Sequence, residues 1–183
     1  MQITIKKAAI KGSLFLSYEF EQTDVDVKNL IKTSSDAPIH DDLRECFRKL
    51  IPHFCFISEE ITNPDIIEKA IKDPDTYLMD EEVSPNPTFF KYRVFQFSVV
   101  EKDGDEVVYL QGSKRLETYK EISFSTPGTS LFDDDYQFVN ELKEAIDELK
   151  SEVLAYMQGK SAPKAQLEMF GEENEEEIET EAL

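Results

Sequence analysis

Six apolar residues recur at intervals of three and four positions near the end of the chain, and no other feature restricts its fold as strongly. They are Val139, Leu142, Ile146, Leu149, Val153 and Tyr156. This spacing predicts an amphipathic helix whose apolar stripe is buried against another element. We expect it to pack on the protein's own sheet, with self-association into a homo-oligomer as the alternative. Asp133–Asp135 should cap this helix, and Gly159 should end it.

Alternation of apolar and polar residues predicts strands near the N-terminus. Residues 2–22 form one or two strands with a turn or bulge at Gly12, and residues 25–33 form a third. This part of the chain therefore supplies one section of an antiparallel sheet.

A three-stranded meander is predicted for residues 89–126. Asp103 and Gly104 mark its first turn, and residues 112–115 mark its second. The apolar phase slips within residues 89–101, which indicates a β-bulge near Val94 or burial of both faces.

Two further helical segments lie between these groups of strands. The first, in residues 34–61, has apolar residues at helical spacing, Asp36 as its expected N-cap, and Pro52 inside it. Proline removes a hydrogen bond and clashes one turn back, so it should split or kink the helix, and we favour a kink. The second should begin near Asn63 and end before Pro74.

These elements predict an α+β fold with a mostly antiparallel sheet of five or six strands, packed by two main helical segments on one side. Residues 1–159 should form a single domain, and residues 160–183 a flexible acidic tail, because that segment has high net charge and few apolar residues.

The net charge of -19 over 183 residues restricts the partners of the chain. Tight sequence-independent binding to duplex DNA needs Lys and Arg, and an acidic excess also repels membranes. No apolar run reaches the ~20 residues of a membrane span, and no signal peptide is recognised. We therefore expect a cytoplasmic protein that does not bind membranes.

No catalytic signature is found. The six glycines do not cluster into a phosphate loop, and His40 and His53 lack the spacing of a zinc site. Cys46 and Cys55 are expected to be buried thiols without a disulfide. We therefore expect a protein that is not an enzyme and has no metal or cofactor.

Basic and aromatic residues are interleaved in the predicted meander. Residues 91–120 hold six basic and five acidic side chains, a different balance from the rest of the chain. The residues of interest are Lys91, Tyr92, Arg93, Tyr109, Lys114, Arg115, Tyr119 and Lys120. Such a sheet can hold single-stranded nucleic acid, since bases stack on aromatics while cations follow phosphates. The alternative is that the aromatics belong to the core and the basic groups are ordinary surface charges.

The last segment contains a short motif, "QLEMF", at residues 166–170. Gln166, Leu167, Met169 and Phe170 give it a resemblance to the clamp-binding motif of bacterial replication and repair proteins. The resemblance implies that the Gln side chain bonds the clamp backbone, while the Leu, Met and Phe side chains fill an apolar pocket of a sliding clamp. It covers five residues only.

The acidic run after this motif resembles the acidic tails of single-stranded DNA-binding proteins, although those tails usually end in an aromatic residue and this chain ends in Leu183. The chain as a whole resembles phage-type replication and recombination accessory proteins, while its body matches no family that we can name. These resemblances imply an accessory protein that binds single-stranded DNA, a sliding clamp or another replication protein. The alternative is an acidic DNA mimic that occupies a host DNA-binding protein with a carboxylate array. That array would include Glu141, Glu144, Asp147 and Glu148.

Overall fold

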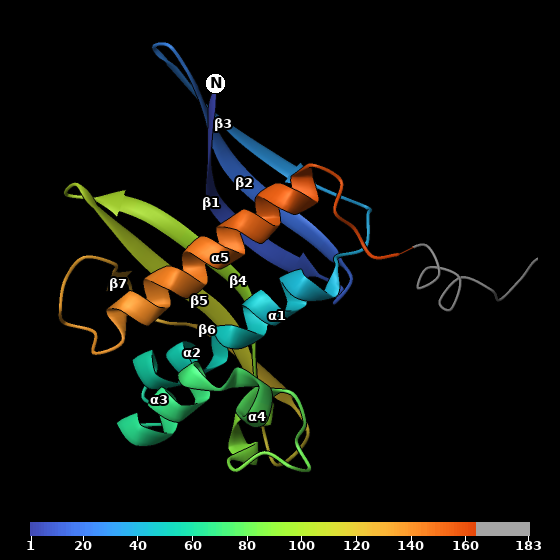
Figure 1. Ribbon diagram of the computed structural model, residues 1–183, viewed down its shortest axis with the longest axis vertical. Coiled ribbons are helices and arrows are strands. Elements are labelled where there is room, and N and C mark those ends of the chain that lie inside the picture. The colour runs from blue at the N-terminus through green and yellow to red at the C-terminus, as the bar shows by residue number, and fades with distance from the viewer. Residues whose placement is uncertain (164–183) are drawn as a thin grey trace, which may run out of the picture.

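The computed structural model describes residues 1–163 and has the predicted α+β fold (Figure 1). Its strands are β1 (Gln2–Lys11), β2 (Phe15–Asp24), β3 (Val27–Ser34), β4 (Tyr92–Lys102), β5 (Asp105–Arg115), β6 (Glu121–Ser125) and β7 (Thr129–Ser130). They form one sheet in the order β3-β2-β1-β4-β5-β6, with β7 also paired to β5 and every pair antiparallel. The helices are α1 (Asp41–Lys49), α2 (Ile51–Ile57), α3 (Pro64–Lys72), α4 (Pro74–Leu78), the 3-10 helix η1 (Pro87–Lys91) and α5 (Val139–Met157).

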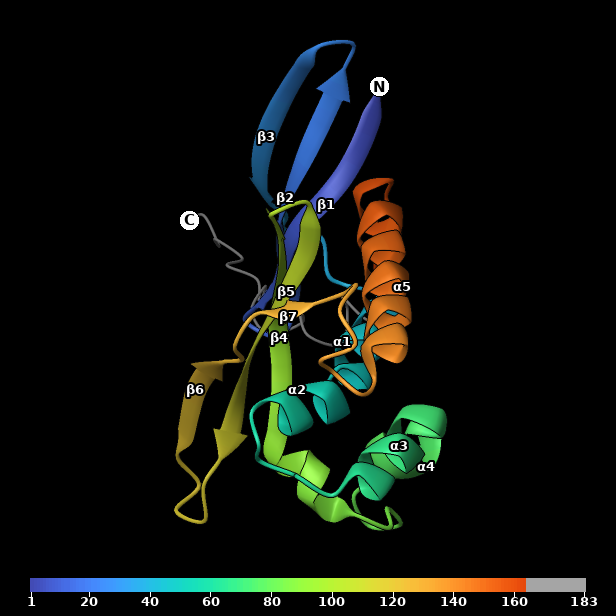
Figure 2. The ribbon, with the colours of Figure 1, turned by 90° about the vertical axis from the view of Figure 1, so that its left-hand side faces the viewer.

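Helix α5 confirms the strongest sequence prediction, since all six residues of its apolar stripe are buried. It lies along the same face of the sheet as α1 (Figure 2). The Tyr156 ring packs edge-on against Tyr18, and its hydroxyl donates a hydrogen bond to the carbonyl oxygen of Ala37. Complete burial of each such side chain contributes about 1.5–3 kcal/mol.

Of the two predictions for the ends of α5, the N-terminal cap is wrong and the C-terminal stop is correct. Asp133–Asp135 do not cap it, because the helix starts only after the side chains of Tyr136 and Phe138 have been buried against Phe56. The cap position is Phe138, which makes no side-chain cap hydrogen bond. Gly159 ends the helix as predicted, with a φ of 104° that favours glycine.

The helical segment around Pro52 is two helices rather than one kinked helix. α1 ends and α2 begins at Leu50, and Pro52 lies in the first turn of α2, where its missing N–H costs nothing. The predicted cap at Asp36 is also wrong, since the N–H groups of Ser35 and Ile39 donate to carbonyl oxygens of β2 and of the turn before it, and α1 starts only at Asp41. His40 caps α1 instead, and its Nδ1 accepts from the N–H of Asp42 at 3.2 Å.

Caps and turn residues in the sequence predicted most of the remaining elements correctly. Asn63 caps α3 as predicted, and a separate helix, α4, follows at Pro74. The Asp103–Gly104 turn is confirmed, with both residues at positive φ. The turn predicted at residues 112–115 is wrong, because these residues continue β5. Gly112 is needed there for close packing: a Cβ would lie 2.3 Å from the carbonyl oxygen of Arg93 and 2.9 Å from the Phe54 ring.

The two faces of the sheet differ sharply in composition. The face under the helices is apolar, and Phe97 and Leu110 pair across β4 and β5 on it with no exposed area. The other face carries a small, mostly polar residue from each strand in one register row. From β3 to β6 this row is Ser34, Ser17, Ala9, Gln96, Gln111 and Ser125. We call this helix-free side of the described fold, residues 1–163, the open face.

Other sequence predictions concern single residues and the end of the domain. Cys46 and Cys55 are buried free thiols, as predicted, and burial raises the pKa of Cys46 to about 12. The folded body continues beyond residue 159. Lys160 pairs with Asp42 at 2.6 Å, and the N–H of Ala162 donates to the carbonyl oxygen of Pro38 at 3.0 Å. No helix in residues 1–163 has the length and apolar character needed to cross a bilayer.

Candidate nucleic-acid interface

A β-bulge in β4 lies beside a hollow lined by residues of β1, β4 and α1. The register between β4 and β5 shifts between Val94 and Gln96, which makes Phe95 the extra residue and confirms the predicted bulge. Pairing between β1 and β4 stops at Ala9 and Gln96, directly beside the bulge. Because a bulge bends its strand, the end of β1 and the start of β4 separate there.

The hollow between these strands has a volume of about 690 Å³, and we call it the cleft. Six basic residues line it, against one carboxylate, Glu121. They are Lys11, Arg44, Arg48, Lys91, Arg93 and Arg115. The floor includes the partly exposed side chains of Phe90 and Phe95. Thus six of the 20 basic residues of an acidic chain gather around one apolar hollow.

Three of the six cleft cations are paired with carboxylates. Arg44 lies 3.7 Å from Asp41, and Arg115 lies 3.9 Å from Glu81. Lys91 pairs with Glu117, and the hydrogen bond from Lys91 holds the pKa of that carboxyl below its usual value. All three pairs are partly or largely exposed, so each contributes little to stability.

The other three cleft cations are Lys11, Arg48 and Arg93. Within residues 1–163, no carboxylate lies within 4.0 Å of any of them. Arg93 lies 5.8 Å from the centroid of the Phe95 ring and donates to the hydroxyl of Ser13 at 3.4 Å. These side chains can donate hydrogen bonds to phosphate oxygens without first breaking an ion pair.

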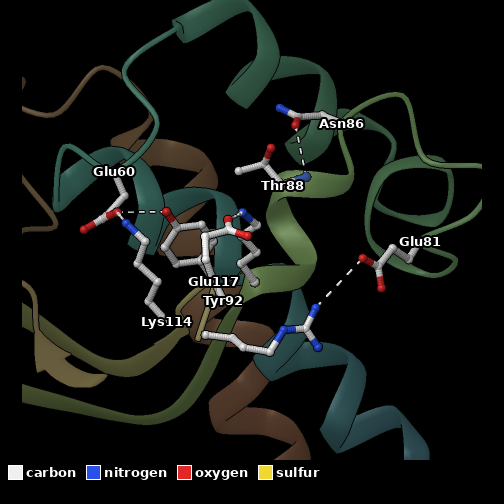
Figure 3. Close-up of polar contacts among 9 residues, drawn as sticks. Glu60, Glu81, Asn86, Thr88, Tyr92, Lys114 and Glu117 are labelled. Carbon is white, nitrogen blue, oxygen red and sulfur yellow. Dashed lines mark hydrogen bonds and ion pairs between the residues drawn. The ribbon is translucent and has the colours of Figure 1, made fainter. Parts of the chain in front are cut away.

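The structure brings together four of the eight residues predicted from the meander, since Lys91, Tyr92, Arg93 and Arg115 all line the cleft. The Tyr92 ring, however, is buried, and its hydroxyl donates to Glu60 at 2.8 Å (Figure 3). It therefore belongs to the core and offers no exposed stacking surface.

Lys114 faces away from the open face, on the side of the helices. It forms an ion pair with Glu60 and lies 5.6 Å from the centroid of the Tyr92 ring (Figure 3). Hydrogen bonds from Lys114 and Tyr92 lower the pKa of Glu60. These three side chains form a mutually paired polar cluster that is partly exposed.

The remaining predicted residues lie apart from the cleft. Tyr109 is on the open face, where its ring packs over Gly128. Tyr119 and Lys120 are in the turn between β5 and β6, and Tyr119 is 86% exposed with a positive φ. The meander thus supplies one wall of the cleft rather than a continuous aromatic platform.

The sequence reasoning missed Lys11, Arg44 and Arg48. Lys11 precedes the β1–β2 turn, and the two arginines stand four residues apart on α1, so they lie on one side of that helix. That spacing was visible in the sequence. What brings α1 and the end of β1 beside β4 is the strand order, which no local pattern encodes.

The carboxylate array expected of a DNA mimic is interrupted. Glu148 on α5 is paired with Lys49 at 2.8 Å. On the same helix, Lys150 pairs with Glu106 at 3.4 Å, and Lys143 lies over the Phe132 ring. Basic groups therefore break up the acidic surface formed by Glu141, Glu144 and Asp147.

Within residues 1–163, no three His, Cys, Asp or Glu side chains are grouped so that they could hold a metal ion. No protein-family model, curated protein or solved structure matches this chain. The predicted clamp-binding residues Gln166, Leu167, Met169 and Phe170 lie outside the described residues.

Proposed function

We propose that this chain is a non-enzymatic accessory protein of DNA replication or recombination that binds single-stranded DNA in the cleft. The observation that carries the proposal is the gathering of six basic side chains around one apolar hollow in a chain with a net charge of -19. An acidic protein repels polyanions over most of its surface. A local concentration of cations therefore selects where an anionic ligand binds.

The cleft provides both contacts that a single strand needs. Lys11, Arg48 and Arg93 supply cations for the phosphates. Phe90 and Phe95 supply partly exposed rings on which bases can stack. Stacking contributes about 1–3 kcal/mol per base and tolerates any base, so we expect weak sequence preference.

Titration of a fluorescent oligonucleotide by anisotropy, at several salt concentrations, tests the proposal. Each contact between a cation and a single-strand phosphate contributes ~-0.7 to the slope of log binding constant against log salt concentration. Three unpaired cations on three phosphates therefore give a slope of about -2. The double variant Arg48→Ala/Arg93→Ala should reduce the slope to about -0.7 and weaken binding at least about tenfold.

The matched control is Lys69→Ala, which removes an exposed positive charge from α3, away from the cleft. It should leave both affinity and slope unchanged. Absence of binding by the wild-type chain, or equal loss in the control and the double variant, would reject the proposal and favour the acidic DNA mimic.

The C-terminal segment supports a second part of the proposal, tethering to a sliding clamp. The supporting observation is the motif at residues 166–170, with three apolar side chains beside an acidic run. Three anchors worth ~1.5–3 kcal/mol each, less an ordering cost of ~2–5 kcal/mol, correspond to about micromolar affinity at best.

A peptide covering residues 165–172, titrated against purified clamp, tests the tether. Phe170→Ala should weaken binding about tenfold or more. In the full chain, Glu177→Ala should have far less effect. If wild-type and Phe170→Ala peptides bind equally, the motif is a coincidence of five residues.

A further inference from the structure

A second, smaller hollow of about 300 Å³ lies on the open face over β1, β2 and β3. Its lining includes Lys7, Lys11, Lys32 and one carboxylate, Glu19. Lys11 borders both this hollow and the cleft. The two hollows are therefore neighbours, with Lys11 at the end of β1 between them.

The second hollow also has a positive balance. Lys7 and Lys32 both face Glu19, at 3.9 and 3.2 Å, so one carboxylate is shared between two cations. Lys11 adds a third positive charge, and no carboxylate lies within 4.0 Å of it in residues 1–163. Anionic groups can therefore bind here as well as in the cleft.

The shape of the surface favours an extended ligand. Ser34, Ser17, Ala9 and Gln96 form neighbouring members of the register row, and all four are small or flexible. Lys32, Glu19 and Lys7 form the adjacent row on the same face. The result is a polar trough with lysines along one side, and serine and glutamine side chains that can donate hydrogen bonds.

We propose that a single strand held in the cleft continues past Lys11 and crosses β1, β2 and β3 through the second hollow. This inference rests on the proposed function, because it takes the strand in the cleft as its starting point. Two interstrand steps of ~4.8 Å, from β1 to β2 and from β2 to β3, add about 10 Å to the track. With at least ~3.4 Å per nucleotide, this extension holds no more than about three further nucleotides.

The test is an anisotropy series with deoxythymidine oligomers of increasing length, using the full chain. Wild-type affinity should increase once the oligomer is long enough to leave the cleft, and then reach a plateau. The double variant Lys7→Ala/Lys32→Ala should lose about three- to tenfold in affinity for long oligomers and none for the shortest that binds.

Lys28→Ala is the matched control for this variant. Lys28 is on the same strand as Lys32, four residues away, equally exposed, and paired with Glu21 at 3.5 Å as Lys32 is paired with Glu19. It does not line the second hollow. Melting temperatures of all variants should stay within a few degrees of wild type, because each exposed ion pair contributes little, and this excludes unfolding as the cause of any loss.

The outcomes separate the inference from the proposed function. If the Lys7/Lys32 variant binds every length as the Lys28 variant does, the second hollow is not part of the track, while binding in the cleft stands. If the Arg48/Arg93 variant also binds as wild type does, both proposals fail. Length-dependent loss confined to the Lys7/Lys32 variant supports the extended track.

Discussion

The two faces of the central sheet are built from the same strands, but one is buried under the helices and the other is open. On β4 and β5, Phe97 and Leu110 face the helices, while their neighbours Gln96 and Gln111 face outward. A step of one residue thus separates a side chain that stabilises the fold from one available to a ligand. Residues on the open face can therefore be changed at little cost to stability.

The largest effect should come from the core between the sheet and the helices, where Leu149 of α5 is buried. Leu149→Ala removes a side chain with no exposed area, so unfolding should become easier by about 2–5 kcal/mol. Gln111→Ala, on the open face, should change stability by no more than about 0.5 kcal/mol. Urea unfolding of both variants measures the difference. Similar losses would show that the two faces are energetically alike.

A buried histidine makes the stability of the helix side dependent on pH. The Nδ1 of His53 lies 2.8 Å from the hydroxyl of Tyr136, and burial lowers the pKa of His53 to about 3. The folded pKa is below the unfolded value of about 6.5. The contribution of neutral His53 to the free energy of unfolding is therefore complete above pH 6.5 and is lost as the pH falls toward 3.

At pH 5 the loss due to His53 should be about 2 kcal/mol relative to pH 7.5. His53→Gln should remove this part of the pH dependence, although the variant is less stable overall. His40→Gln, at the half-exposed start of α1, should retain it. An equal decrease in wild type and His53→Gln would contradict the assignment. Unfolding curves at the two pH values give the answer.

The smallest effect should come from Glu19 on the open face. Glu19→Gln releases Lys7 and Lys32, so affinity for long oligonucleotides should increase by a few-fold at low salt and return to the wild-type value at high salt. Stability should decrease by about 0.2–1 kcal/mol. Glu21→Gln, which releases Lys28 alone, is the control and should leave affinity unchanged. Equal affinities for the two variants would place Glu19 outside the binding surface.

The sequence was informative wherever a local pattern decides the structure. The stripe of α5, the Asp103–Gly104 turn and the bulge beside Val94 follow from spacing and turn chemistry, and all three are present. The cap at Asp36 was wrong because tertiary hydrogen bonds tie that segment to β2 and the turn before it, so the helix starts later. The turn at residues 112–115 was wrong because Gly112 allows close packing rather than a change of direction.

Only half of the basic residues of the cleft could be predicted from the sequence, for a related reason. Lys91, Arg93 and Arg115 come from one meander, so their proximity follows from consecutive strands. Arg44 and Lys11 come from elements far away in the sequence, and only the crossover that places β1 beside β4 brings them to the cleft. A periodic pattern carries no information about such a crossover.

The bulge at Phe95 makes the cleft sensitive to the length of the chain. Deletion of this one residue would restore a regular register with β5 while leaving every other β4 side chain on its present face. The ladder between β1 and β4 could then run on past Ala9, and it would place Lys11 directly opposite Arg93. Like charges in that position repel. With Phe95 present, the two cations are instead separated and line opposite sides of the cleft.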